Sequence, residues 1–221
     1  MTERPIIFNG DMVRAILSGQ KTQTRRPVRP PFEIHRLNGS NGTNGFLAHP
    51  DGYGGRFEPY PCPFGQPGDR LWVRETWRLA DPEGEDALSE DVYGPYAPFI
   101  GSNGSRKIRW RVIYQATSSE NHPKYGKALW TPSIHMPRWA SRLILELTDI
   151  NVERVQDITE DEAINEGVVD PIMGTYGMNP ITIFRDLWDA LYAKRPGLLW
   201  QENPWVWAIS FRRVEQSNAQ S

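Results

Sequence analysis

Four stretches of the chain alternate apolar and polar residues, and this period of two constrains the fold more than any other feature of the sequence. The stretches are residues 68–77, 106–116, 141–155 and 203–214. In the last of them, one face carries Trp205, Trp207, Ile209 and Phe211. Successive side chains of a β-strand point to opposite sides, so the alternation predicts strands with a buried face. We therefore expect the core to be built on a sheet.

Helical spacing occurs in three regions, at residues 9–19, 158–167 and 180–197. In the first, Asp11 can cap the helix, and Gly19 can end it because glycine takes the left-handed conformation at little cost. The second opens with a capping box from Thr159 to Glu162. For the third, helical intervals predict that the buried residues are Ile183, Phe184, Leu187, Trp188 and Leu191.

Two long segments, near 27–68 and 80–105, show no period and are rich in glycine, proline and asparagine or in acidic residues. The first segment is typical of a lid, a binding loop or a mobile insertion, and we favour the last. For the second segment a solvated loop is a sufficient explanation. With the strands and helices above, this predicts a single α+β domain over residues 1–214 that contains both insertions. We expect its mixed sheet to close into a small β-barrel with flanking helices, and residues 215–221 to form a disordered tail.

Composition narrows the possible functions. The formal net charge is −2, so any contact with nucleic acid must come from a local basic patch. One cysteine allows no internal disulfide and no CxxC zinc site. The four histidines lack metal-binding spacing, and we expect no metal and no cofactor. No apolar run approaches a membrane span, so we expect a cytoplasmic protein without a membrane partner.

The segment ILSGQKTQTRRP, residues 16–27, presents Lys21, Thr24 and Arg26 just after the first predicted helix. Farther along, Glu75 falls on the otherwise apolar face of the strand at 68–77. A buried carboxylate is unfavourable unless a cation or several hydrogen-bond donors meet it. We therefore expect a basic group to point inward at Glu75.

These four residues could form a catalytic group. Burial lowers the pKa of a lysine, so a neutral Lys21 amine could act as a base and activate the Thr24 hydroxyl. Glu75 would orient the lysine but would also raise its pKa, and the balance between these effects is open. Arg26 could hold an oxyanion. Alternatively, the basic residues only decorate a helix end and Glu75 forms an ordinary ion pair, which residue types alone favour.

The segment GQKTQTRR also resembles the signature of ASCH domains, at Gly19, Lys21, Thr24 and Arg26. ASCH domains resemble PUA domains, which are small β-barrels associated with RNA, so the resemblance implies a PUA-like barrel. The segments GDRLWVRETW and WTPSIHMPRWASR look like those of larger ASCH proteins encoded by bacteriophages and prophages. The resemblance thus implies a bacterial host cell.

At the motif, the chain is similar to small bacterial ASCH enzymes that are N4-acetylcytidine amidohydrolases. The resemblance implies catalytic roles for Lys21 and Thr24, with the glutamate at Glu75, and a modified cytidine nucleoside or nucleotide as substrate. It leaves open whether Thr24 or a water molecule is the nucleophile. The alternatives are a non-catalytic RNA- or DNA-binding module, a nuclease of the same fold, or an accessory protein that binds a host component. The oligomeric state is open.

The segment WTPSIHMPRW adds further candidates for substrate binding. Trp130 could stack on a base, while His135 or Arg138 binds its edge or a phosphate. The alternative, which we favour slightly, is a turn fixed by its prolines that places Trp139 in the core.

Overall fold

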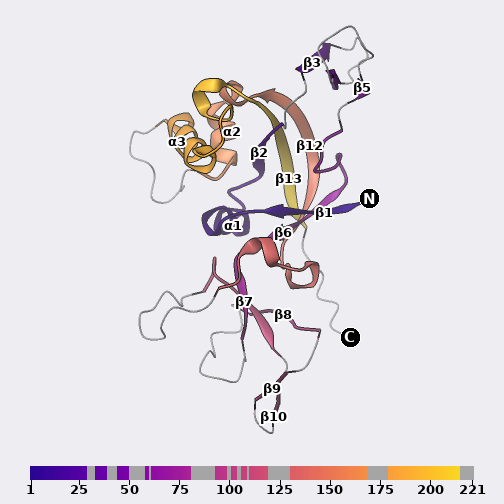
Figure 1. Ribbon diagram of the computed structural model, residues 1–221, viewed down its shortest axis with the longest axis vertical. Helices are drawn as coiled ribbons and strands as arrows, with labels where there is room; N and C mark the ends of the chain where they lie inside the picture. Colours follow the sequence, from indigo (N-terminus) through magenta and orange to yellow (C-terminus); the bar gives the residue numbers. More distant parts are fainter. Residues whose placement is uncertain are drawn as a thin grey trace. The chain divides into compact units, whose positions relative to one another are not determined.

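The computed structural model describes residues 1–28, 33–38, 44–49, 58–59, 61–80, 93–98, 101–103, 106–108, 110–118, 130–168 and 179–214. The chain divides into two compact units, which we describe separately. Figure 1 labels their helices and strands. Unit 1 comprises Met1–Gly19, Arg70–Glu146 and Arg213–Ser221, and unit 2 comprises Gln20–Asp69 and Leu147–Arg212. Two of the boundaries between them fall inside strands, one in β12 (Ile144–Arg154) and one in β13 (Trp205–Val214). The single domain over 1–214 stays a prediction, and the predicted tail at 215–221 lies outside the described residues.

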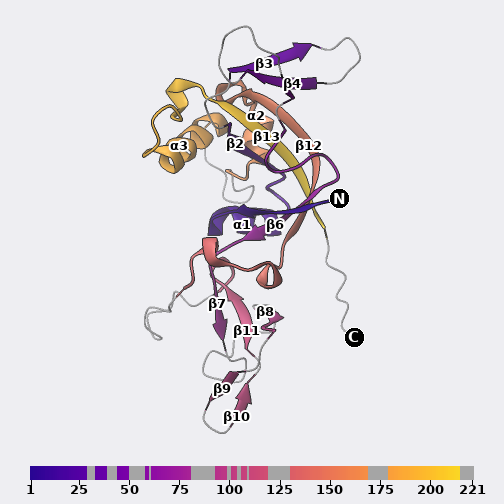
Figure 2. The ribbon, with the colours of Figure 1, turned by 45° about the vertical axis from the view of Figure 1, so that its right-hand side comes forward.

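Among its described residues, unit 1 combines one α-helix with short strands. Its elements are β1 (Glu3–Ile7), α1 (Gly10–Leu17), β6 (Arg70–Arg74), β7 (Trp77–Ala80), β8 (Tyr93–Tyr96), β9 (Gly101–Asn103), β10 (Arg106–Ile108) and β11 (Arg111–Tyr114). Strand β1 runs parallel to β6, and β6 is antiparallel to the start of β12. Strand β11 lies between β7 and β8 and is antiparallel to both (Figure 2). Strands β9 and β10 form a separate antiparallel pair.

The alternation predicted for residues 68–77 is confirmed in unit 1. Leu71, Val73, Glu75 and Trp77 are all buried, with exposed fractions of 0%, 1%, 2% and 8%. The prediction of one continuous strand is wrong, because β6 ends at Arg74 and β7 begins only at Trp77. The inward carboxylate therefore lies at the break between two strands.

Helix α1 is confirmed, with one correction at its start. The N-cap is Asn9, whose side-chain oxygen accepts a hydrogen bond of 2.9 Å from the Met12 N–H, and Asp11 lies in the first turn instead. The Asp11 carboxylate forms an ion pair with Arg14. Gly19 follows the helix with φ of 79°, as predicted from its lack of a Cβ.

Unit 2 contains most of β12 and the remaining α-helices and strands. They are β2 (Gln23–Pro27), β3 (Glu33–Asn38), β4 (Asn44–His49), β5 (Glu58–Pro59), α2 (Glu160–Asn165), α3 (Pro180–Tyr192) and most of β13 (Trp205–Val214). Strand β13 is antiparallel to β2, and β12 is its other neighbour. Strands β3, β4 and β5 form a three-stranded antiparallel sheet.

The absence of regular structure predicted near 27–68 and 80–105 is therefore wrong, since both segments contribute strands. These strands pair through their backbones, which does not require apolar and polar side chains to alternate. The first segment is rich in glycine and asparagine, so its strands show no alternation of apolar and polar residues. The parts of both segments that the structure does not describe lie outside this comparison.

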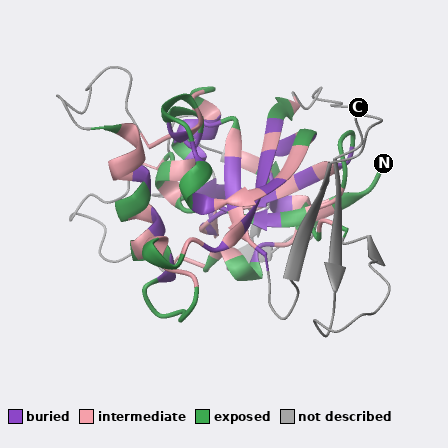
Figure 3. Cartoon of the chain, turned by 90° about the horizontal axis from the view of Figure 1, so that it is seen from above, coloured by how far each residue is buried: buried purple, intermediate pink, exposed green. Residues whose placement is uncertain are grey.

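The core of unit 2 forms between helices α2 and α3 and the neighbouring strand ends. It contains Val155, Ile158, Ala163, Phe184, Trp188, Tyr192 and Val206. Figure 3 shows that the helices carry both buried and exposed residues. In α3, Phe184 and Trp188 are buried as predicted, but Leu191 is 47% exposed and Tyr192 takes its place. The reason is that Phe184, Trp188 and Tyr192 follow one another at intervals of four, and the rings of Trp188 and Tyr192 lie 4.5 Å apart.

The α+β class is confirmed. Among the described strands no sheet closes into a barrel, so the barrel stays a prediction. Within the described part of the chain, no helix is long and apolar enough to cross a membrane.

Candidate functional site

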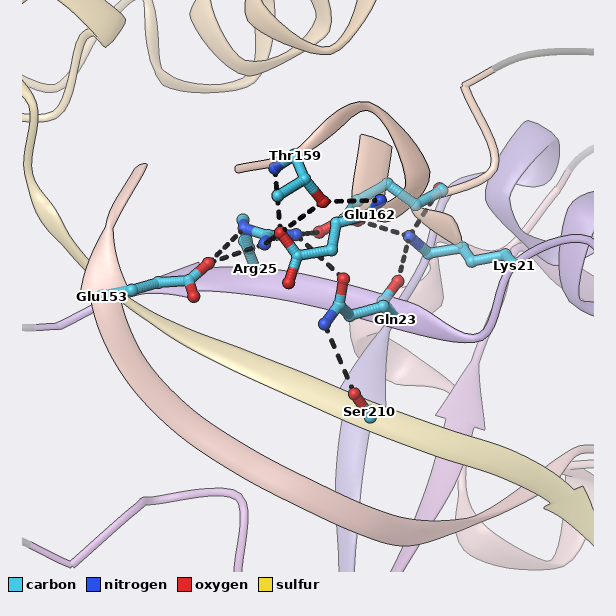
Figure 4. Close-up of polar contacts among 8 residues, drawn as sticks. Lys21, Gln23, Arg25, Glu153, Thr159, Glu162 and Ser210 are labelled. Atoms are coloured by element: carbon cyan, nitrogen blue, oxygen red, sulfur yellow. Dashed lines mark hydrogen bonds and ion pairs between the residues drawn. The ribbon is translucent and has the colours of Figure 1, made fainter. Parts of the chain in front are cut away.

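The predicted catalytic lysine is wholly enclosed. The Lys21 side chain has an exposed fraction of 0%, and its Nζ donates to three oxygen atoms. These are the Gln23 carbonyl at 2.8 Å, the Glu166 carbonyl at 2.7 Å and the Glu166 carboxylate at 2.7 Å. An ammonium group has three N–H donors, so this arrangement fits the charged form of Lys21. Lys21 lies two residues before β2 (Gln23–Pro27), and Figure 4 shows its amine directed toward Gln23.

Local structure explains why Glu166 lies there. Glu166 is the C-cap of α2, and Gly167 follows it with φ of 78°, so the helix ends at this point. The last carbonyl groups of a helix lack partners within the helix, and a cation near them is favourable. Lys21 satisfies the Glu166 carbonyl and the Glu166 carboxylate at once. The amine is thus fixed to the end of α2 by two contacts with one residue.

Arg25 contacts Glu166, the partner of Lys21, and two further carboxylates. Its guanidinium is fully buried, and its nitrogen atoms lie 2.6 Å from Glu153, 3.1 Å from Glu162 and 3.5 Å from Glu166. Glu153 comes from β12, whereas the other two come from α2. Arg25 also donates to the side-chain oxygen of Gln23 at 3.1 Å (Figure 4). We call Lys21, Arg25, Glu153, Glu162 and Glu166 the charge cluster of unit 2.

Burial and neighbouring charges shift the pKa values of this cluster in opposite directions. Burial lowers the pKa of Lys21, while the Glu166 carboxylate opposes the change. Burial raises the pKa of Glu153, against the effect of Arg25. Burial also acts to raise the pKa of Glu162, but hydrogen bonds from Thr159 and the charge of Arg25 outweigh it and lower that pKa. Lys21 is thus the cation of the cluster that can lose its proton, since a guanidinium does not in proteins.

Thr24 and Arg26 lie on β2, next to this cluster in sequence. Thr24 is 2% exposed and pairs with Ile209 of β13, and Arg26 pairs with Trp207. Side chains alternate along a strand, so Thr24 and Arg26 point to the face opposite that of Arg25. Burial raises the pKa of the Tyr192 phenol, and a hydrogen bond with Arg26 opposes this. An approach of the Thr24 hydroxyl to the Lys21 amine stays a prediction.

Glu75 belongs to unit 1, where an arginine holds it. Nε and Nη2 of Arg142 each donate to a different carboxylate oxygen of Glu75, at 2.9 Å in both cases. The Arg142 guanidinium also lies 3.9 Å from the centre of the Tyr114 ring and donates to Thr117. Burial raises the pKa of Glu75, and Arg142 opposes the rise. The expectation that a basic group meets this inward carboxylate is therefore confirmed, and we call this group the Glu75–Arg142 pair.

The predicted catalytic residues are thus divided between the units. Lys21, Thr24 and Arg26 lie in unit 2 and Glu75 lies in unit 1. Lys21 pairs with Glu166 and Glu75 pairs with Arg142, in each case within one unit. A contact between Lys21 and Glu75 stays a prediction.

The other predicted substrate-binding residues lie in unit 1. Trp130 is half-buried, and Arg78 lies 5.5 Å from the centre of its ring. His135 is exposed at the end of a 3₁₀ turn. Arg138 is exposed and forms hydrogen bonds of 2.8 and 3.3 Å with Glu3. Trp139 packs edge-on against Trp77, at the side of a buried cluster. This agrees with the alternative that the prolines fix a turn and direct Trp139 toward the core.

Sequence reasoning missed Glu166 and Arg142. An acid at the end of a helix is unfavourable beside the partial negative charge there, so Glu166 directly before Gly167 was a sign of a nearby cation. Arg142 had a weaker sign, a single basic residue just before the apolar run of β12. Neither sequence feature indicates that Glu166 pairs with Lys21 or that Arg142 pairs with Glu75.

Comparison of the chain with family models, curated proteins and solved structures finds no match. In the described part of the chain, no three or more histidine, cysteine, aspartate or glutamate side chains are grouped so that they could hold a metal ion.

Proposed function

We propose that this chain is an ASCH-type amidohydrolase that removes the acyl group from N4-acylated cytosine in a nucleoside, a nucleotide or a nucleic acid. Lys21, Thr24 and Glu75 are its catalytic residues, and Arg26 binds the substrate. The barrel of the PUA-like fold is part of the same proposal.

One observation carries the proposal: the lysine at the motif position is enclosed with its amine bound to a carboxylate. Burying a lysine costs free energy, and ionisable groups with perturbed pKa values are typical of catalytic sites. A surface decoration of a helix end would leave the amine in water. The burial of Lys21 favours catalysis over that alternative.

The reaction adds water across an amide. The nucleophile, which is the Thr24 hydroxyl or a water molecule, loses its proton to the neutral Lys21 amine and attacks the acyl carbon. Arg26 or backbone N–H groups stabilise the resulting oxyanion. Lys21 then returns the proton to the exocyclic nitrogen as the C–N bond breaks, which gives cytosine and a carboxylic acid. With Thr24 as nucleophile, water hydrolyses the acyl-enzyme in a second step. The ammonium described above is the form that protonates the leaving group.

Incubation with N4-acetylcytidine tests the proposal, with chromatography to separate cytidine from the substrate. We expect turnover by the unchanged protein and none by Lys21→Arg, which keeps the positive charge but cannot release its proton. Lys194→Arg is the matched control, since Lys194 is exposed after α3, and should keep full activity. Intact substrate at high protein concentration argues against the proposal.

A non-catalytic nucleic-acid module is the second candidate, and the exposed His135, which follows the half-buried Trp130 by five residues in the sequence, favours it. Binding would then fall steeply with salt as phosphate contacts are lost. Lys21→Ala separates the two candidates, because loss of turnover with unchanged ligand binding favours catalysis. RNA or DNA binding that does not respond to salt argues against the module.

A further inference from the structure

We infer that Glu166 is the residue that positions the Lys21 amine and controls how readily it releases its proton. The significance of this inference for catalysis rests on the proposed function. Glu166 acts through Lys21 and is therefore a positioning residue.

The geometry ties the amine to Glu166 more closely than a single ion pair would. Both the main-chain carbonyl and the carboxylate of Glu166 accept from Lys21 Nζ, each at 2.7 Å. The side chains are 0% and 4% exposed, so little water competes for these contacts. A second link joins the same elements, since the Thr22 N–H donates to the Asn165 carbonyl at 2.9 Å. The segment that carries Lys21 is therefore joined to the end of α2 through both its side chain and its backbone.

The charges around Lys21 show why Glu166 decides its protonation. The Arg25 and Arg26 guanidinium groups of β2 favour the neutral amine, as burial does. Glu166 of α2 favours the ammonium. Arg25 in turn faces Glu153, Glu162 and Glu166, and Tyr192 of α3 faces Arg26 and Glu166. Of the carboxylates in the charge cluster, Glu166 lies in direct contact with the amine and the other two act on it through Arg25.

Glu166→Gln tests this directly, because glutamine has the same shape but no charge and leaves the backbone contact in place. We expect the pKa of Lys21 to fall by roughly 1–3 units, the usual effect of one close opposite charge. The chain has five lysines, so NMR titration of the lysine side chains can follow each of them, and Lys21→Arg identifies the signal of Lys21. Glu153→Gln is the matched control: it removes a carboxylate that contacts Arg25, and it should lower the pKa of Lys21 by less.

Turnover of N4-acetylcytidine gives a second readout. The kcat of the enzyme should change at the pH where Lys21 titrates. In Glu166→Gln this pH should move by the same amount as the midpoint of the NMR titration of Lys21. A merely structural role of Glu166 would instead lower kcat at every pH. Should Glu166→Gln fail to fold, Glu166→Asp replaces it: the charge is kept but withdrawn by one methylene, and the midpoint should fall by a smaller amount.

The two proposals fail in different ways. A Lys21 midpoint that stays unchanged in a folded Glu166 variant overturns the inference, whether or not the protein is active. Absence of turnover with a shifted midpoint overturns the proposed function and supports the positioning role of Glu166.

Discussion

In unit 1 the buried carboxylate of Glu75 meets an arginine, whereas in unit 2 that of Glu166 meets a lysine and an arginine. The Glu75–Arg142 pair is closed, because two parallel hydrogen bonds join the two groups and Arg142 stacks on Tyr114. The charge cluster of unit 2 is not such a one-to-one pair, because Arg25 contacts three carboxylates.

The difference shows which unit can transfer a proton. Arginine stays charged at any pH a protein tolerates, so Arg142 can fix Glu75 but cannot accept its proton. Lysine exchanges its proton when burial and neighbouring cations lower its pKa. The charge cluster of unit 2 is therefore suited to acid–base chemistry, and the Glu75–Arg142 pair is suited to holding a carboxylate in one place.

The largest effect is expected from Lys21→Met, which removes the titrating cation. Turnover should fall by about 10²–10⁴-fold, the usual contribution of a general acid or base. Stability should also fall by roughly 3–5 kcal/mol, because Glu166 is left buried without its lysine. Arg25 still faces Glu166 at 3.5 Å, which places the loss toward the lower end. Urea unfolding measures the change in stability.

The double variant Lys21→Met with Glu166→Gln serves as the control. It removes both charges, so most of the stability should return while turnover stays lost. Equal destabilisation in the single and double variants would mean that packing, and not the unpaired carboxylate, is responsible.

Arg142→Lys applies the reverse test to unit 1 by placing a titrating cation against Glu75. An ammonium cannot make the two parallel hydrogen bonds of a guanidinium, so one bond to a charged group is lost. We expect unfolding to become easier by about 1.5–3 kcal/mol. Thermal unfolding at pH 7 measures this, and an unchanged stability would mean that the closed geometry of the pair is unimportant.

Local patterns in the sequence predicted the elements but not the partners. The alternation from Leu71 to Trp77 placed Glu75 inside, and the capping box at Thr159 marked the start of α2. Lys21 and Glu166, however, are 145 residues apart, and Glu75 and Arg142 are 67 apart. Which charges meet over such separations depends on how strands and helices pack, and no local period records that. The motif identified Lys21, but its carboxylate partner in unit 2 came only from the structure.

The N-caps of α2 and α1 allow a second comparison of the two units, with smaller expected effects. Thr159→Ala in unit 2 and Asn9→Ala in unit 1 each remove a side chain that accepts from the first turn of a helix. Each should cost about 1 kcal/mol in urea unfolding. Only Thr159→Ala should also raise the pKa of Glu162, because the Thr159 hydroxyl donates to that carboxylate at 3.0 Å. NMR titration of the glutamate side chains checks this, and an unchanged Glu162 would show that the backbone bond from Thr159 is sufficient.

The smallest effect is expected at the exposed pair between Glu3 and Arg138 in unit 1. The hydrogen bond from Arg138 lowers the pKa of Glu3 below 4.5. A carboxylate with a lowered folded-state pKa stabilises the protein above about pH 4.5, and this contribution is lost as the pH falls through the folded value. Arg138→Gln should therefore cost roughly 0.2–1 kcal/mol at pH 7 and nothing once Glu3 is protonated. Because both side chains are in water, about 1 M salt should remove most of the difference, whereas it should leave the buried Glu75–Arg142 pair almost unaffected. A cost for Arg138→Gln that persists at low pH and high salt would show that the arginine stabilises unit 1 through packing instead of charge.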